Sequence, residues 1–111
     1  MIYKGGCHCG RIAFEVEGEL EQVMDCNCSI CTKRGYLHWF VAPDKLRLST
    51  PESALATYTF KSHKLKHHFC PNCGCAPFVM GADGASVNVR CLEGVDLEAI
   101  PVRRVFGSEY P

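Results

Sequence analysis

The amino-acid sequence predicts a mainly β protein, an antiparallel fold of about eight to ten short strands. Three segments alternate apolar and polar residues, which is typical of strands with one buried face: residues 12–16, 58–60 and 87–91. Four more short apolar runs lie at residues 37–42, 46–48, 77–80 and 102–106. No alternation of strands with long helices is visible, so a parallel sheet with crossover helices is not expected.

Turn residues and two helical segments divide these runs along the chain. A short helix is expected at residues 29–34, between the first strand and the strand at residues 37–42. Turn-forming residues then separate successive strands at positions 43–44, 50–51 and 82–84. A second short helix is expected at residues 96–100, where the side chain of Asp96 can cap the first turn, and the last strand follows it.

Length and charge narrow the functional classes. A chain of 111 residues is expected to form one domain, residues 1–111, around a single modest core. Twelve lysines and arginines balance twelve aspartates and glutamates, which removes the usual electrostatic case for a nucleic-acid or anionic-membrane partner. No apolar signal segment follows Met1, and no run approaches the roughly 18 apolar residues of a membrane span. We therefore expect a cytoplasmic protein.

The nine cysteines are grouped in a way that indicates metal binding. Their pattern is Cys7-x-Cys9, Cys26-x-Cys28-x2-Cys31, Cys70-x2-Cys73-x-Cys75 and a solitary Cys91. Structural disulfides are rare in the cytoplasm, so clustered thiols there most often hold a metal ion. Two thiolates on one tight turn can bind the same ion, and a structural zinc ion needs four ligands, hence two such turns.

The clearest half of a zinc site is formed by Cys70 and Cys73. Gly74 follows them and permits a left-handed backbone that directs amide groups at the sulfur atoms. The pair Cys7 and Cys9 supplies the other half with no cysteine left over. The spacing therefore predicts a closed, structural four-cysteine zinc site.

Three cysteines then remain together in the sequence: Cys26, Cys28 and Cys31. Three protein ligands and one open position are how catalytic zinc ions are held. Three thiolates make the ion soft, so it should bind a substrate sulfur better than it activates water. A thiol bound there would lose its proton and become a nucleophile or a leaving group. The pattern thus predicts two zinc ions per chain and a zinc enzyme whose small-molecule substrate carries sulfur.

Four segments resemble the family of the glutathione-dependent formaldehyde-activating enzyme and centromere protein V. They are GCHCG at residues 6–10, CNCSIC at 26–31, HHFCPNCG at 67–74 and VNVRCL at 87–92. The resemblance implies a β-tent fold, in which antiparallel sheets are joined by a four-cysteine zinc site, and it implies the same two ligand sets. It also implies carbon–sulfur lyase activity, which makes or cleaves S-hydroxymethylglutathione from glutathione and formaldehyde.

Three functions from different classes stay open: a zinc-dependent carbon–sulfur lyase, a non-catalytic zinc module that binds a protein partner, and a thiol reductase. The zinc module would be favoured if Cys75, Cys91 or a histidine closed the three-cysteine site. The reductase would be favoured if Cys75 or Cys91 were exposed with a depressed pKa. Packing as a small apolar residue is the simpler expectation for both cysteines.

Two histidines are candidates for roles beside the metal. His38 follows the three-cysteine segment in a strand and is the predicted acid or base, with an ordinary hydrogen-bonded strand histidine as the alternative. His67 precedes Cys70 by three residues, and we expect it either to support that ligand or to be exposed. Partners for the carboxylates of glutathione are offered by a set of basic residues: Arg34, Lys61, His63, Lys64, Lys66, His67, His68 and Arg90.

Overall fold

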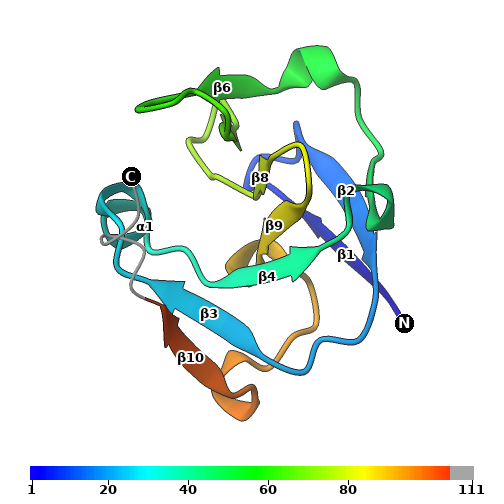
Figure 1. Ribbon diagram of the computed structural model, residues 1–111. Helices are drawn as coiled ribbons and strands as arrows, with labels where there is room; N and C mark the ends of the chain where they lie inside the picture. Colours follow the sequence, from blue (N-terminus) through cyan, green and yellow to red (C-terminus); the bar gives the residue numbers. More distant parts are fainter. Residues whose placement is uncertain (106–111) are drawn as a thin grey trace.

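The computed structural model describes residues 1–105, and in this part of the chain ten strands form two sheets (Figure 1). A three-stranded sheet has the order β1-β2-β5, with β1 at Ile2–Gly6, β2 at Ala13–Glu17 and β5 at Leu46–Leu48. A seven-stranded sheet has the order β10-β3-β4-β9-β8-β7-β6. Its strands, in that order, are Val102–Val105, Val23–Cys26, His38–Val41, Ala85–Asn88, Phe78–Met80, Lys66–Phe69 and Ala56–Tyr58. The prediction of a mainly β protein is confirmed.

One strand pair departs from the antiparallel prediction. β10 runs parallel to β3, and Val102 pairs with Val23. Residues 89–101 carry the chain from β9, in the middle of the sheet, to the outer side of β3. β10 therefore joins the edge of the sheet in the direction of β3, whereas the other strand pairs among the described residues are antiparallel.

Both predicted helical segments are present. α1 spans Ser29–Arg34, as predicted, and ends at Gly35, whose left-handed φ of 68° lets its amide donate to the Cys31 carbonyl. At the second segment, Asp96 accepts a hydrogen bond of 3.1 Å from the Glu98 amide and opens a single 3-10 turn. The 3-10 helices lie at Pro43–Lys45, Glu52–Ala54, Val89–Cys91 and Leu97–Ala99. Within residues 1–105, no helix has the length and apolar character needed to cross a membrane.

The predicted strand at residues 87–91 is shorter than its alternation indicates. β9 ends at Asn88, whose side chain accepts a hydrogen bond of 3.2 Å from the Arg90 amide. This hydrogen bond starts the 3-10 helix Val89–Cys91, so Cys91 lies after the strand rather than within it. The strand predicted at residues 102–106 is present as β10, and its last predicted residue, Phe106, lies outside the described residues.

Two apolar clusters form the core. The larger one fills the space between the two sheets and contains Ile12, Phe14, Val16, Val23, Trp39, Cys70, Phe78, Val87 and Val89. The smaller one lies beside the three-cysteine segment and contains Ile30, Cys31, Tyr36, Ala76 and Val79. Tyr36 is only 1% exposed, and its hydroxyl accepts a hydrogen bond of 3.0 Å from Arg34 Nη1. The smaller cluster therefore anchors α1, and with it Cys31, against the seven-stranded sheet.

Candidate functional site

A four-cysteine cluster joins the two sheets. Cys7 and Cys9 follow β1, Cys70 and Cys73 follow β7, and their four Sγ atoms lie within 4.8 Å of one another. The Sγ atom of Cys9 lies 3.7 Å from that of Cys7 and 3.5 Å from that of Cys70. Sulfur ligands at about 2.3 Å from a tetrahedral zinc ion would be separated by about 3.8 Å. The structure thus brings together the residues predicted for this site, in an arrangement that fits a metal ion.

Backbone amides surround the sulfur atoms of this cluster. The Ile12 amide donates to Cys7 Sγ at 3.2 Å, and the Cys73 amide donates to Cys70 Sγ at 3.4 Å. Gly74 has the left-handed φ of 82° that its place after Cys73 predicts, and its amide donates to the Cys70 carbonyl. Backbone hydrogen bonds at Cys75 and at Cys9 lower the pKa of the Cys73 thiol to about 5. Thiolate, the form that binds metal, is therefore favoured at Cys73, whereas burial raises the pKa of Cys70.

A second cluster contains the other three predicted cysteines. Cys26 is the last residue of β3, Cys28 precedes α1, and Cys31 lies in the first turn of that helix. Their Sγ atoms lie within 4.8 Å of one another, and no other cysteine, histidine or acidic residue in the described chain joins this group. Burial, together with the neighbouring thiols of Cys28 and Cys26, raises the pKa of Cys31. A metal cation would offset the repulsion between three such thiolates, so the donor set fits a metal ion with three protein ligands.

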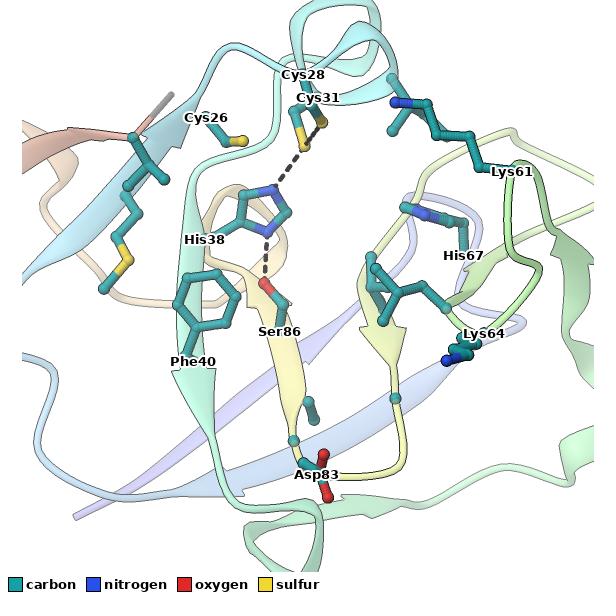
Figure 2. A pocket seen from close by; sticks show the side chains of 18 of the residues that line it. Cys26, Cys28, Cys31, His38, Phe40, Lys61, Lys64, His67, Asp83 and Ser86 are labelled. Carbon is teal, nitrogen blue, oxygen red and sulfur yellow. Dashed lines mark hydrogen bonds between the residues drawn. The ribbon is translucent and has the colours of Figure 1, made fainter. Parts of the chain in front are cut away.

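The three-cysteine cluster opens into a pocket, whereas the four-cysteine cluster does not line it. The pocket has a volume of about 710 Å³, which is within the range of small-molecule sites. Figure 2 shows the cysteines at one end of the pocket, with His38 on one wall and His67 on the opposite one. Apolar side chains make much of the lining, among them Met24, Ile30, Phe40, Phe60, Leu65 and Val79. Two cations and one carboxylate, Lys61, Lys64 and Asp83, lie in exposed loops at its border.

His38 contacts the three-cysteine cluster directly. It is the first residue of β4 and is only 5% exposed, and its Nε2 lies 3.1 Å from Cys31 Sγ. Its Nδ1 is hydrogen-bonded to the hydroxyl of Ser86, in β9. Burial, with a smaller effect from His67, lowers the pKa of His38 to about 4. At neutral pH the ring is therefore uncharged, with both of its nitrogens already engaged.

Sequence reasoning missed Ser86. The residue occupies an ordinary position in a short strand, and nothing in its sequence context indicates that it faces a histidine. The pairing of β4 with β9 brings the two strands together, with Phe40 opposite Ser86 and His38 opposite Asn88. The contact between His38 and Ser86 thus depends on strand register, which the sequence alone does not specify.

His67 lies in the wall of the pocket and is 4% exposed, although it stands only three residues before Cys70. Neither Nδ1 nor Nε2 has a hydrogen-bond partner among the described residues. Its ring packs near Phe60, with ring centroids 5.3 Å apart, and near Tyr36 at 6.4 Å. Burial, and then the charges of Arg34 and His68, lower its pKa. An unpaired buried polar group costs about 1–3 kcal/mol of stability, so these two nitrogens require an explanation.

The basic residues predicted as partners for the carboxylates of glutathione lie on different surfaces. Lys61 and Lys64 line the pocket, whereas His68 is hydrogen-bonded to the Thr57 hydroxyl at 2.9 Å. The guanidinium of Arg34 lies 5.2 Å from the ring centroid of Phe69 and is not part of this pocket wall. Of the predicted carboxylate partners in residues 1–105, only Lys61, Lys64 and His67 therefore face the pocket.

Cys75 and Cys91 belong to neither cluster. Both are partly buried, and Cys91 Sγ lies 3.9 Å from the carbonyl oxygen of Ala76. Burial, and then the neighbouring thiols of Cys75 and Cys7, raise the pKa of Cys91 to about 11. A thiol that reduces disulfides needs a lowered pKa, so the environment of Cys91 does not favour the reductase.

Comparison with known proteins agrees with this geometry. The family model of the glutathione-dependent formaldehyde-activating enzyme matches residues 2–106. The chain belongs to this family. A crystal structure of a Rhodobacter sphaeroides protein is similar, with 31% sequence identity and a TM-score of 0.80, and the match covers 90% of this chain and 99% of that chain. The family assignment made from the cysteine segments is thereby confirmed, and membership supports either a glutathione-related function or a zinc module.

The buried histidines predict a loss of stability in acid. An imidazole in an unfolded chain has a pKa of about 6.5. In the folded chain, burial lowers the pKa of His38 to about 4 and also lowers that of His67. Below about pH 6.5 the unfolded chain therefore binds more protons than the folded chain, and the free energy of unfolding falls as the pH is lowered.

We expect the free energy of unfolding of the variant His67→Phe to depend less on pH than that of the wild type. Urea unfolding at several pH values between about 7.5 and 5 should show the free energy of unfolding falling further in the wild type than in the variant as the pH falls. Loss of metal in acid affects both proteins alike, so the difference between them reports on His67. A constant difference across this range would mean that the folded and unfolded states protonate this imidazole equally.

Proposed function

We propose that this protein is a zinc-dependent carbon–sulfur lyase that acts on the adduct of a small-molecule thiol with an aldehyde, such as S-hydroxymethylglutathione. The observation that carries the proposal is the position of the three-cysteine cluster in the wall of a small-molecule pocket, with no fourth protein ligand among the described residues. Membership of the glutathione-dependent formaldehyde-activating family supports the choice of thiol.

The two clusters have different roles in this proposal. The four-cysteine cluster is structural, because it ties the sheets together away from the pocket. A zinc ion held by Cys26, Cys28 and Cys31 would supply a soft Lewis acid that prefers a substrate sulfur to water. The apolar lining excludes water from the bound adduct, and Lys61 and Lys64 attract the carboxylates of the thiol.

The proposal predicts that the two metal sites can be separated by mutation. We expect Cys73→Ser to give unfolded or insoluble protein, because a structural zinc site contributes on the order of 10 kcal/mol to the folding of a small domain. Cys28→Ser should keep the fold and lose only the more weakly held zinc ion. Metal analysis and thermal unfolding of the two variants measure this difference. Equal unfolding of both variants would make the three-cysteine site structural as well.

Acceleration of adduct exchange tests the activity itself. NMR exchange spectroscopy of glutathione with formaldehyde, with and without the zinc-loaded protein, should show faster formation and loss of the hydroxymethyl adduct. In cobalt-substituted protein, glutathione should change the visible spectrum, because a further sulfur donor alters the charge-transfer bands. Cys28→Ser serves as the control that lacks the site. No acceleration together with an unchanged cobalt spectrum would favour a zinc module that binds a protein partner.

The assignment of His38 as acid or base stays a prediction, and two substitutions test it. His38→Ala should lower turnover by about a hundredfold if the ring transfers a proton. His38→Gln retains a neutral hydrogen-bond donor, the side-chain amide, that can reach Cys31. This amide cannot take up a proton near neutral pH. Equal losses in both variants would support proton transfer, whereas recovery with glutamine would show that His38 acts by orienting Cys31, to which Nε2 is hydrogen-bonded. The rate of adduct exchange at saturating glutathione is the measurement.

A further inference from the structure

An imidazole with no hydrogen-bond partner lies in the wall of the pocket, opposite His38. His67 is 4% exposed, and neither of its ring nitrogens finds a partner in residues 1–105. Figure 2 shows its side chain extending from β7 into the pocket, across from His38. A neutral imidazole offers one N–H donor and one bare nitrogen acceptor, and a fold rarely buries both of them unpaired.

A packing role alone does not account for this histidine. Three other histidines of the described chain have side-chain partners: His38 with Cys31 and Ser86, His63 with Thr59, and His68 with Thr57. The neighbours of His67 are the rings of Phe60 and Tyr36, which would pack equally well against phenylalanine. No hydrogen bond links its ring to Cys70 either, so it does not orient that ligand.

The segment that carries Phe60 borders the pocket next to His67. Residues 59–65 connect β6 to β7, and Phe60, Lys61, Lys64 and Leu65 from this segment line the pocket. Lys61 and His63 have left-handed φ angles of 53° and 58°, which are unfavourable for residues with a side chain. A small shift of Phe60, together with rotation of the imidazole about its Cβ–Cγ bond, would present a nitrogen of His67 to a bound molecule.

We propose that His67 binds the hydroxyl group of the thiol adduct and accepts its proton when the carbon–sulfur bond breaks. The inference rests on the proposed lyase function and identifies the residue that contacts the oxygen of its substrate. A hydroxyl group is both donor and acceptor, so it matches the two unpaired atoms of a neutral imidazole better than a carboxylate does, which only accepts.

The proton transfer balances without any further reactant. The O–H bond breaks as the proton moves to the bare nitrogen of His67, and its electron pair forms the second carbon–oxygen bond of the aldehyde. The carbon–sulfur bond breaks with its pair remaining on sulfur, which leaves as thiolate. The imidazolium then releases the proton to water, and adduct formation follows the same steps in reverse.

The positions of His38 and His67 around Tyr36 support different roles for the two histidines. The Tyr36 ring centroid lies 4.9 Å from that of His38 and 6.4 Å from that of His67, so both imidazoles flank the same aromatic ring. His38 touches the cysteine cluster and has both nitrogens engaged, which suits a residue that orients Cys31. His67 has neither nitrogen engaged, and this leaves it available for the oxygen of a substrate whose sulfur lies at the cysteines.

The experiment compares the zinc-loaded wild type with two variants of this residue. His67→Phe keeps an aromatic ring and removes both nitrogens, and His67→Gln keeps a neutral hydrogen-bonding group that is not a base. His68→Phe is the matched control, because His68 is the next residue of β7 and is hydrogen-bonded to Thr57 rather than lining the pocket. Thermal unfolding and zinc content confirm that each variant is folded.

Ring-nitrogen NMR gives a readout that does not depend on turnover. S-hydroxymethylglutathione, formed from glutathione and formaldehyde, should shift the ¹⁵N resonances of His67, whereas S-methylglutathione, which lacks the hydroxyl group, should not. Adduct exchange should fall by about a hundredfold in His67→Phe. It should fall nearly as far in His67→Gln, and it should stay close to wild type in His68→Phe.

Failure of the inference can be distinguished from failure of the lyase proposal. Wild-type acceleration that persists in His67→Phe would overturn the role of His67 and leave the lyase intact. A wild type without acceleration would remove the lyase, and the NMR comparison would then decide whether His67 binds the hydroxyl group. Equal shifts with both ligands, or no shift with either, would overturn that binding.

Discussion

The convergence of four sulfur atoms from two distant turns is the constraint on which the rest of the structure depends. One turn follows β1 in the three-stranded sheet and the other follows β7 in the seven-stranded sheet, so the cluster joins both sheets at one point. A core of this size gains much from such a tie, since unfolding must separate the two turns. Because Cys70 anchors the end of β7, the same tie places His67, three residues earlier, in the pocket wall.

The three-cysteine cluster is held by packing and strand register instead. α1 places Cys28 and Cys31 about one turn apart, and the buried ring of Tyr36 packs in the same cluster as Cys31. A chain of hydrogen bonds then runs from Ser86 in β9 through His38 in β4 to Cys31. The orientation of this sulfur is thus coupled to the pairing of two central strands.

Most features that sequence reasoning predicted depend on neighbours along the chain, whereas the pairing of Cys7 and Cys9 with Cys70 and Cys73 followed from the grouping of the cysteines. Local spacing and side-chain chemistry predict the tight turn that carries Cys70 and Cys73, the helix at Ser29–Arg34 and the helix cap at Asp96. The parallel pairing of β10 and the contact of His38 with Ser86 join residues far apart in the sequence, where periodicity carries no information about register. The absence of hydrogen-bond partners for His67 could not be predicted for the same reason, because it depends on the side chains and backbone groups of all the elements packed around it.

The contrast between His38 and His67 bears on how the pocket is organised. Both rings are buried and flank Tyr36, so the two rings pack in similar surroundings. The fold satisfies both nitrogens of one ring and neither nitrogen of the other, although domains of this size have only about 5–15 kcal/mol of stability to lose. A satisfied imidazole beside a sulfur ligand holds its position, whereas an unsatisfied one gains its hydrogen bonds only when a ligand is bound. The destabilisation at His67 is therefore recovered as binding free energy, at the wall opposite the histidine that contacts Cys31.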